Sequence, residues 1–294
     1  MATIIESTRD QAIEEYERDG ATVLRGVIST DAIDELGRAI DALMDDGEHG
    51  IEGAGDKGRF FGDLFSTLHQ PAFRSFVENS GLAEIAGQIM RSSEVRFFYD
   101  QLLVKEPGTP ARTPWHQDLP YWPATGNQVI STWIPIDAAS PENGVVTYVR
   151  GSHRWNRFFP MQPFAEGGPV ETGGSEAWQE NSIYDRADGP GKNTLSDVRD
   201  HPEHYSFANW RVEPGDVILH HPLTVHGAPG NLSRDRRRRA LALRWFGDDA
   251  RWDDSRPHFM RRFKDKPGFP YPPLSQGEPM DAPIFPLMWR ASGG

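Results

Sequence analysis

Three side chains in this sequence have the types and the spacing of a mononuclear iron site. His116 and Asp118 lie two residues apart, and a third candidate ligand, His226, lies far along the chain. Two imidazoles and one carboxylate can hold Fe(II) on one face and leave the opposite positions open for a cosubstrate and oxygen. This donor set indicates oxidative chemistry at a non-haem iron, and its structural alternative is a hydrogen-bonded His-x-Asp pair near a turn.

Three histidines compete for the third position of this donor set. His220 and His221 end the apolar run 216–219, so they are either ordinary strand-end histidines or hydrogen-bond donors to a ligand. His226 is followed by Gly227, which leaves room for a close approach of the backbone. We therefore prefer His226 as the third ligand.

An element must bring His116 and Asp118 to one side of the chain. Residues two apart on a β-strand point to the same face, so we expect residues 115–118 to be extended. From residue 95 onward, strand-like runs alternate with turns rich in Pro and Gly. These runs are 95–105, 130–136, 145–149, 216–220 and 240–246. The pattern predicts an antiparallel barrel or double sheet of the jelly-roll kind.

Helical patterns precede these strands. Residues 11–19 predict a short charged helix that ends at Gly20, a common residue after a helix C-terminus. A second helix is marked by apolar residues at helical spacing, namely Ile33, Leu36, Ile40 and Leu43. Residues 71–90 predict a further helix or a pair of helices. The five glycines of 47–58 predict a mobile loop.

We expect these elements to form one domain over residues 1–294. Its N-terminal part, about 8–93, would be helical and would pack on the β core of 95–246. The tail 250–294 is rich in Pro and would wrap the core without regular structure. Residues 159–207 show little hydrophobic periodicity and predict a long insertion, which would set the choice of substrate because long loops often bind ligands.

Composition excludes several classes of protein. Of the 294 residues, 37% are hydrophobic and 25% are charged, as in soluble globular domains. We expect no membrane segment and no signal peptide. The lack of cysteine excludes disulfides and thiolate metal sites, and it fits a reducing cytoplasm. A formal net charge of -12 opposes nucleic-acid binding, for which the arginine-rich run 234–239 is the one local argument.

Further motifs accompany the candidate ligands in a fixed order. They are Trp115-His116-Gln117-Asp118, Thr132-Trp133-Ile134-Pro135-Ile136-Asp137, Glu142-Asn143-Gly144, Gly151-Ser152-His153-Arg154, Val225-His226-Gly227 and Arg238-Arg239-Ala240-Leu241. In this order they resemble the phytanoyl-CoA dioxygenase family, and residues 18–26 resemble that family's N-terminal signature. The resemblance extends over about residues 10–246. It implies a mainly β fold, a double-stranded β-helix (a cupin-like jelly roll) with N-terminal helices packed on the barrel.

The resemblance also implies an activity and a set of site residues. The family's iron ligands match His116, Asp118 and His226. The arginine that pairs with the distal carboxylate of 2-oxoglutarate matches Arg238, with Arg237 as the runner-up, because a planar guanidinium can bind a carboxylate through two hydrogen bonds. Gln101 and Trp133 match positions near the cosubstrate. Where the family often has a hydroxyl residue, this chain has Ala228, so one cosubstrate contact is missing or replaced.

These residues imply an Fe(II)- and 2-oxoglutarate-dependent dioxygenase that consumes O2 and hydroxylates a C–H bond of a small-molecule metabolite, with release of succinate and CO2. The presence of Asp118 favours hydroxylation over halogenation, because related halogenases use the place of the carboxylate for halide. Two alternatives remain. The same iron centre could catalyse desaturation, ring closure or epimerisation, or the barrel could bind a metal or a small ligand without turnover.

Overall fold

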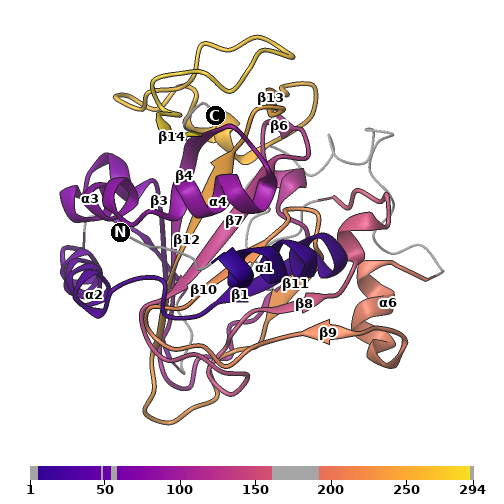
Figure 1. Cartoon of the computed structure of the whole chain (residues 1–294). Coiled ribbons are helices and arrows are strands. Elements are labelled where there is room, and N and C mark those ends of the chain that lie inside the picture. The colour runs from indigo at the N-terminus through magenta and orange to yellow at the C-terminus, as the bar shows by residue number, and fades with distance from the viewer. Residues whose placement is uncertain (1–5, 48, 54–57, 161–191, 292–294) are drawn as a thin grey trace.

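Two antiparallel sheets form the core of the computed structural model, which describes residues 6–47, 49–53, 58–160 and 192–291. The large sheet follows the order β1 (Ala21–Leu24), β10 (Val217–His220), β7 (Val129–Pro135), β12 (Arg238–Phe246), β4 (Glu94–Lys105), β3 (Phe60–Leu64) and β2 (Ile51–Gly53), and β14 (Leu287–Arg290) also pairs with β4. The small sheet follows the order β5 (Thr113–His116), β11 (His226–Ala228), β8 (Thr147–Val149) and β9 (Phe207–Ala208). A two-stranded ribbon joins β6 (Ala124–Thr125) to β13 (Arg251–Trp252). The predicted jelly-roll fold is thus confirmed (Figure 1).

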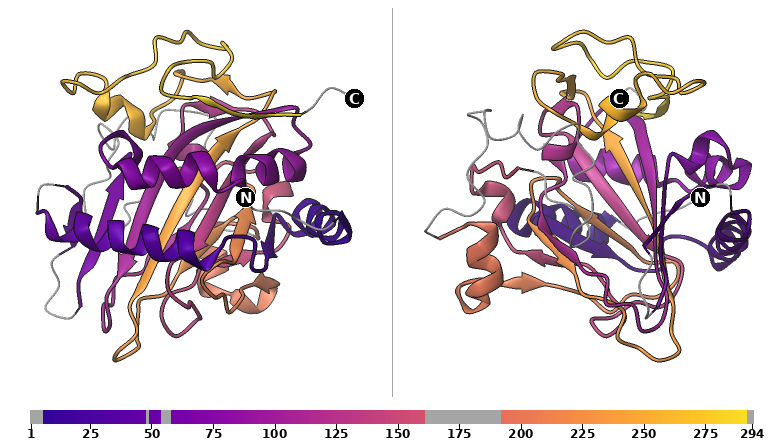
Figure 2. Two further views of the ribbon diagram at one scale, coloured as in Figure 1. Left: turned by 60° about the vertical axis from the view of Figure 1, so that its left-hand side comes forward. Right: turned by 180° about the vertical axis from the view of Figure 1, so that it is seen from behind.

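Helices cover the outer face of the large sheet, as Figure 2 shows in its left view. They are α1 (Glu6–Asp19), α2 (Thr30–Asp45), α3 (Pro71–Asn79) and α4 (Leu82–Met90). The predicted apolar positions of α2 are buried against Leu241 and Leu243 on the outer side of β12, so their assignment is confirmed. Among the described residues, every helix is too short or too polar to cross a membrane.

The N-terminal helices differ in detail from the prediction. Helix α1 begins at Glu6 rather than at residue 11, and Gly20 ends it with a φ of +80°. A side chain at Gly20 would lie 2.4 Å from both His153 Nδ1 and Thr224 Oγ1, so glycine is required there for space as well as for conformation. Residues 71–90 form two helices, which Gly81 separates with a φ of +76°.

Three segments that we expected to lack regular structure contain it. Part of the glycine-rich stretch 47–58 is β2, which pairs with β3 and extends the large sheet. The C-terminal tail includes β14, whose strand pairing a run rich in Pro did not suggest. Of the predicted insertion, residues 161–191 lie outside the described residues, and the rest contains α6 (Leu195–Asp200) and the first residue of β9. Short 3-10 helices complete the list of elements, namely η1 (Ser66–Leu68), η2 (Leu119–Tyr121), η3 (Ser152–Arg154), η4 (Pro202–His204) and η5 (Phe259–Phe263).

The inner face of the large sheet looks toward the small sheet. Ala240 and Ala242 of β12 are buried there in a cluster with Trp133 of β7 and Tyr148 of β8. Because side chains alternate along a strand, Arg238 and Arg244, at the two ends of this alanine pair, share the inner face. The alanine side chains are small, and the charged groups of Arg238 and Arg244 lie at the two ends of this pair.

Candidate metal centre

Three buried side chains converge at the edge of the small sheet. His116 and His226 lie directly opposite each other on β5 and β11, and Asp118 follows β5. The Nε2 atoms of His116 and His226 lie 3.5 and 3.6 Å from Oδ1 of Asp118. Ligand atoms of all three residues lie within 4.8 Å of one another, and the residues are only 4% to 6% exposed. The structure therefore brings together the three side chains that the sequence suggested as iron ligands.

The protons of both imidazoles lie on the side away from this cluster. Nδ1 of His116 is 2.8 Å from the carbonyl oxygen of Pro114, and Nδ1 of His226 is 2.9 Å from that of Thr224. A carbonyl oxygen only accepts, so each Nδ1 carries the proton and donates it. The two Nε2 lone pairs and the carboxylate of Asp118 then face one another with no proton between them. A cation bound by all three removes this repulsion.

The backbone at Asp118 is not the expected strand. We predicted that His116 and Asp118 share one face of an extended segment, but β5 ends at His116 and Asp118 has helical angles (φ -77°, ψ -42°). Its N–H and that of Leu119 donate to the carbonyl of Pro222, at 2.8 and 3.1 Å. These bonds begin η2, whose second residue is a proline and therefore suits a first helical turn. A turn, rather than strand alternation, returns the carboxylate to the histidines.

The second oxygen of Asp118 is held by three groups of the large sheet. Oδ2 accepts a hydrogen bond from Ser131 Oγ at 3.0 Å and one from His220 Nε2 at 3.3 Å. A guanidinium nitrogen of Arg244 lies 3.9 Å away. Burial raises the pKa of Asp118, but the hydrogen bond from His220 and the charge of Arg244 oppose it, and this pKa lies well below its ordinary value. The carboxylate is therefore charged, with one oxygen held and the other facing the histidines.

The two other candidate histidines have different partners. His220 donates to Asp118 through Nε2, so its Nδ1 accepts from the hydroxyl of Tyr148 at 3.2 Å. His221 faces away from the cluster, and its Nδ1 accepts from the N–H of Leu223 at 3.1 Å. Burial lowers the pKa of His221 to about 3, so this ring is neutral. Of the three histidines, His226 is the one that belongs to the cluster with His116 and Asp118.

Arg238 lies inside the barrel with unused donors. It is 2% exposed, and its Nη1 donates to the carbonyl of Leu103 at 3.0 Å. Its Nε is buried and has no hydrogen-bond partner among the described residues. Burial lowers the pKa of Arg238 to about 10, which still leaves it charged at neutral pH. A buried cation with free donors is the expected anchor for a carboxylate of a ligand.

A second buried basic side chain, which the sequence did not lead us to expect, lies beside Arg238. Lys105 is the cross-strand partner of Arg238, is 1% exposed, and donates to the carbonyl of Pro229 at 2.7 Å. Burial, followed by the charge of Arg238, lowers the pKa of Lys105 well below its ordinary value. The available signal was alternation, because Gln101, Leu103 and Lys105 must share one face of β4. A carboxylate bound at this end of the barrel would pair with Arg238 and favour the protonated form of Lys105.

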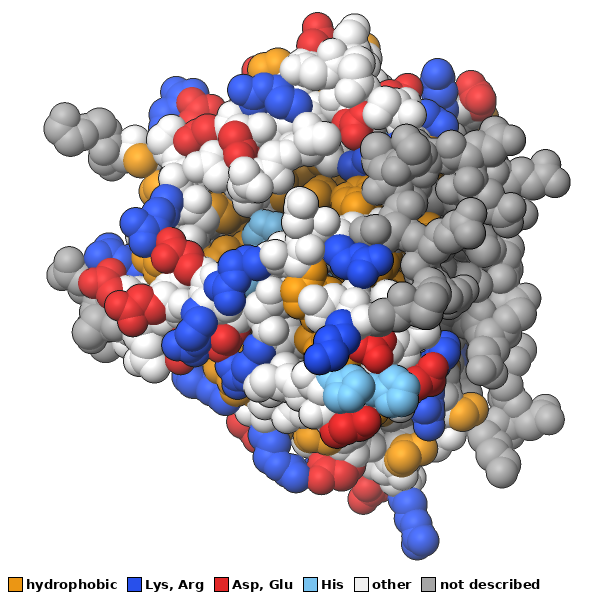
Figure 3. All heavy atoms as spheres, turned by 90° about the vertical axis from the view of Figure 1, so that its right-hand side faces the viewer, with side chains coloured by type: hydrophobic (Ala, Val, Ile, Leu, Met, Phe, Trp, Pro, Cys, Tyr) orange, Lys and Arg blue, Asp and Glu red, His pale blue; other side chains and the backbone are white. Residues whose placement is uncertain are grey.

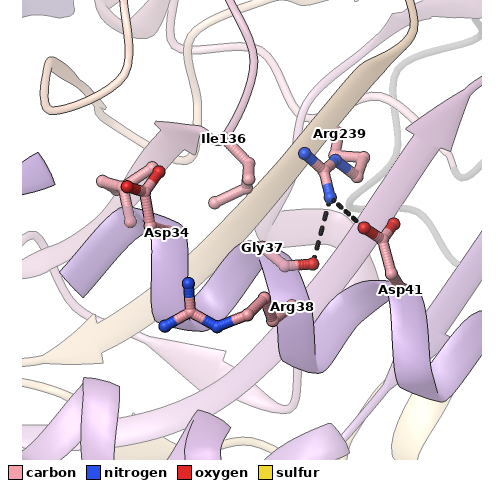
Figure 4. A pocket seen from close by; sticks show the side chains of 7 residues that line it. Asp34, Gly37, Arg38, Asp41, Ile136 and Arg239 are labelled. Atoms are coloured by element: carbon pink, nitrogen blue, oxygen red, sulfur yellow. Dashed lines mark hydrogen bonds and ion pairs between the residues drawn. The ribbon is translucent and has the colours of Figure 1, made fainter. Parts of the chain in front are cut away.

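Arg237 and Arg239 lie on the outer face of the sheet, against α2. Arg237 forms ion pairs with Asp41 and Glu106, and Arg239 donates to Asp41 and to Asp137. Figure 4 shows Arg239 at a surface hollow of about 210 Å³ beside α2, with hydrogen bonds to Asp41 and to the Gly37 carbonyl. Both guanidinium groups are thus engaged on the outer face, away from the metal cluster.

The two cosubstrate positions suggested by the family also lie on the inner face. The indole Nε1 of Trp133 is buried and, within the described part of the chain, lacks a hydrogen-bond partner. The guanidinium carbon of Arg238 lies 5.9 Å from the centre of the Trp133 ring. Gln101 is differently engaged, because its Oε1 accepts from Arg244 at 2.8 Å. Trp133 can thus donate to a ligand near Arg238, whereas Gln101 positions Arg244.

The aromatic residues near the motif divide into two groups. Trp122 and Phe159 are fully buried and belong to the protein core. Tyr121 presents its edge to the ring of His116, with the ring centres 5.9 Å apart. Trp115 alternates with His116 along β5 and packs on the other side of the small sheet, against Phe207 and Val225.

Comparisons of the sequence with known proteins agree with this geometry. The sequence model of a family described as phytanoyl-CoA dioxygenase matches residues 16–240. The multifunctional dioxygenase prhA of Penicillium brasilianum is 23% identical over 254 residues, which cover 81% of this chain and 72% of that protein. A probable alpha-ketoglutarate-dependent hypophosphite dioxygenase of Stutzerimonas stutzeri is 27% identical over 172 residues, 58% of this chain and 52% of that protein.

Solved structures share the fold over nearly the whole chain. The alpha-ketoglutarate-dependent epimerase SnoN from nogalamycin biosynthesis aligns with a TM-score of 0.70 and 20% identity, over 97% of this chain and all of that one. The alpha-ketoglutarate-dependent carbocyclase SnoK from the same biosynthesis aligns with a TM-score of 0.70 and 23% identity, over 98% of this chain and all of that one. At these identities the likeness establishes the double-sheet architecture.

Proposed function

The chain belongs to the phytanoyl-CoA dioxygenase family, and on this premise we propose that it hydroxylates a C–H bond of a small organic molecule with Fe(II), 2-oxoglutarate and O2. The observation that carries the proposal is the buried cluster of His116, Asp118 and His226, with unused donors of Arg238 on the same side of the large sheet. We further propose a cytoplasmic enzyme that binds neither nucleic acid nor membrane, in keeping with its net charge of -12.

His116, Asp118 and His226 would hold the iron. Both imidazoles present unprotonated Nε2 atoms, and Asp118 presents Oδ1, so all three donors are ready for a divalent cation without a proton shift. The separations of 3.5 and 3.6 Å from Oδ1 are close to the about 3 Å between adjacent ligands at metal–ligand bonds of about 2.1 Å. The donor set of two imidazoles and a carboxylate is one that suits Fe(II) and leaves positions for a chelating cosubstrate.

Arg238, Lys105 and Trp133 would hold 2-oxoglutarate. The distal carboxylate would pair with Arg238, and the Trp133 indole N–H would supply a further hydrogen bond. The charge of Arg238 would attract this carboxylate, and burial strengthens the attraction by excluding water, while the bound carboxylate would favour the protonated form of Lys105. Ala228 offers no hydroxyl near the distal histidine, so the indole N–H would take over part of that contact.

When bound, iron with 2-oxoglutarate supplies the activation of O2, because oxidation of the keto acid to succinate and CO2 provides two electrons. The protein residues perform the remaining tasks. Ser131 and His220 hold Oδ2 of Asp118, so the carboxylate offers one oxygen to the metal. The partly exposed Tyr121, whose edge faces the His116 ring, would exclude water and orient the substrate.

A second outcome at the same centre is desaturation, ring closure or epimerisation. It is favoured by the two solved structures named above, since one is an epimerase and the other a carbocyclase. A barrel that binds ligands without turnover is the third alternative. The segment 159–207 would decide between substrates, so replacing it should change the substrate range and leave iron and 2-oxoglutarate binding intact.

The test is anaerobic addition of Fe(II) and then 2-oxoglutarate to metal-free protein. A visible charge-transfer band reports a keto acid chelated to iron. We expect the band in the parent protein, its loss in His226→Ala, and a shift of its half-saturation to higher 2-oxoglutarate in Arg238→Ala. Iron binding without a band would refute the proposal. A band without release of succinate in the presence of candidate substrates would favour the third alternative, a barrel that binds ligands without turnover.

A further inference from the structure

A second group of metal-binding side chains lies on the surface, on the turn between α6 and β9. His201, Glu203 and His204 are all exposed, and one ligand atom from each lies within 4.8 Å of the others. Exposed histidine side chains lie next to acidic ones on the face shown in Figure 3. We propose that these three residues form a site for a borderline divalent cation such as Zn²⁺, separate from the buried centre.

The distances suit a metal ion of this kind. Nδ1 of His201 lies 3.4 Å from Oε1 of Glu203, and Nε2 of His204 lies 3.9 Å from the same oxygen. At zinc–ligand bonds of about 2.0–2.1 Å, two ligands of a tetrahedral site lie about 3.4 Å apart. One separation already has this value, and the other must shorten by about 0.5 Å. Exposed side chains make such a movement with small rotations about their own bonds.

The backbone of the turn holds the three ligands near one another. Pro202 lies between His201 and Glu203, and its fixed φ restricts the turn. The N–H of His204 donates to the carbonyl of His201 at 3.0 Å, and that of Tyr205 donates to Pro202 at 3.1 Å. The two imidazole rings are stacked with centres 5.2 Å apart. Because the ligands come from four consecutive residues of a closed turn, metal binding orders few additional groups.

An independent observation is the carboxylate behind His204. Oδ1 of Asp197, on α6, lies 3.7 Å from Nδ1 of His204. The hydroxyl of Tyr205 donates to the other oxygen of Asp197 and holds this carboxylate in place. A carboxylate at Nδ1 favours the tautomer with the proton on that nitrogen, which leaves the Nε2 lone pair for a metal. A rotation that shortens this separation would give His204 the outer hydrogen bond that metal-bound histidines usually have.

The donor set selects the class of cation. Two imidazoles favour Zn²⁺, Ni²⁺ or Cu²⁺ over Mg²⁺ and Ca²⁺, which prefer oxygen ligands. Three protein ligands on an open surface leave the remaining position to water. The turn leads into β9, which pairs with β8 of the small sheet, and β8 also pairs with the strand that carries His226. A bound cation would stabilise this side of the small sheet.

Zinc binding by protein without an affinity tag tests the proposal. In equilibrium dialysis at low micromolar free Zn²⁺, we expect two equivalents per chain in the parent protein and one in the double variant His201→Ala/His204→Ala. His226→Ala removes the buried centre, so we expect this variant to bind one equivalent of Zn²⁺. The triple variant that also carries His201→Ala and His204→Ala should bind none. The exposed substitutions leave the fold intact, and unfolding curves without metal verify this.

The control variants separate a built site from general affinity for histidine. His49→Ala removes a partly exposed histidine that stacks on His69, and zinc stoichiometry should stay at two. Asp197→Asn should weaken the surface equivalent by about 10-fold or more, because it removes the group that orients His204. One equivalent in the parent, unchanged by the double variant, would overturn the proposal. One equivalent that is lost in the double variant and kept in His226→Ala would instead leave it standing and contradict the buried iron centre.

Discussion

Replacing Arg238 by lysine keeps a positive charge and removes the second donor that a carboxylate needs. One guanidinium nitrogen is already used on the Leu103 carbonyl, so the cosubstrate depends on the remaining donors, of which Nε has no partner among the described residues. A hydrogen bond to a charged group contributes about 1.5–3 kcal/mol. Loss of one such bond corresponds to a roughly 10- to 150-fold increase in the Kd of 2-oxoglutarate.

The assay is anaerobic titration of the Fe(II)-loaded protein with 2-oxoglutarate, followed by the charge-transfer band. Arg237→Lys is the matched control, because Arg237 precedes Arg238 in the chain but forms ion pairs with Asp41 and Glu106 on the outer face. We expect its Kd to stay within about twofold of the parent value, since partly exposed ion pairs contribute little. A larger loss in Arg237→Lys than in Arg238→Lys would show that we have assigned the wrong arginine.

Three further predictions concern the metal centre and the fold. His220→Gln should keep the fold but weaken the hydrogen bond that holds Asp118, so the Kd for Co(II) should rise about 10-fold. The matched variant His221→Gln should change this Kd little, and equal effects of the two variants would refute the prediction. His221 is neutral when folded, with a pKa of about 3 from burial, so the unfolded chain alone takes up a proton below about pH 6.5. The metal-free parent should therefore lose stability on the order of 1 kcal/mol per pH unit from this residue as the pH falls from 6.5 to 5, and urea unfolding of His221→Gln should show a shallower decline. Gly20→Ala should destabilise the protein by about 1–3 kcal/mol, because the backbone at this position has a φ of +80° and an added Cβ would clash with His153 and Thr224. A melting temperature equal to that of the parent protein would contradict this prediction.

The identity of the candidate ligands could be predicted from sequence because the chemistry requires particular side chains. His116 and Asp118 are recognisable by type and spacing, whatever backbone carries them. The backbone itself was predicted incorrectly, since hydrogen bonds from Asp118 and Leu119 to Pro222 end the strand and begin a turn. Those bonds join segments about 100 residues apart, and no local pattern contains them.

The arginine run 234–239 also depends on contacts that no local sequence pattern contains. Alternation correctly separates Arg238 from Arg237 and Arg239, but it does not say which face is inside. The outer face is recognised only when α2 brings Asp41 to meet Arg237 and Arg239. Short strands were also missed, because two or three residues such as those of β9 carry too little periodicity and form through their neighbours.

The pairing of His116 with His226 across two strands has a consequence for folding. The two residues are cross-strand partners, yet about 110 residues of chain separate them. A metal ion bound to both closes a loop of that length, as a disulfide would in a chain that had cysteines. Loop closure of this kind removes freedom from the unfolded chain and ties the edge strand β5 to β11 of the small sheet. Availability of iron in the cell would then set the lifetime of this protein against proteolysis as well as its capacity for catalysis.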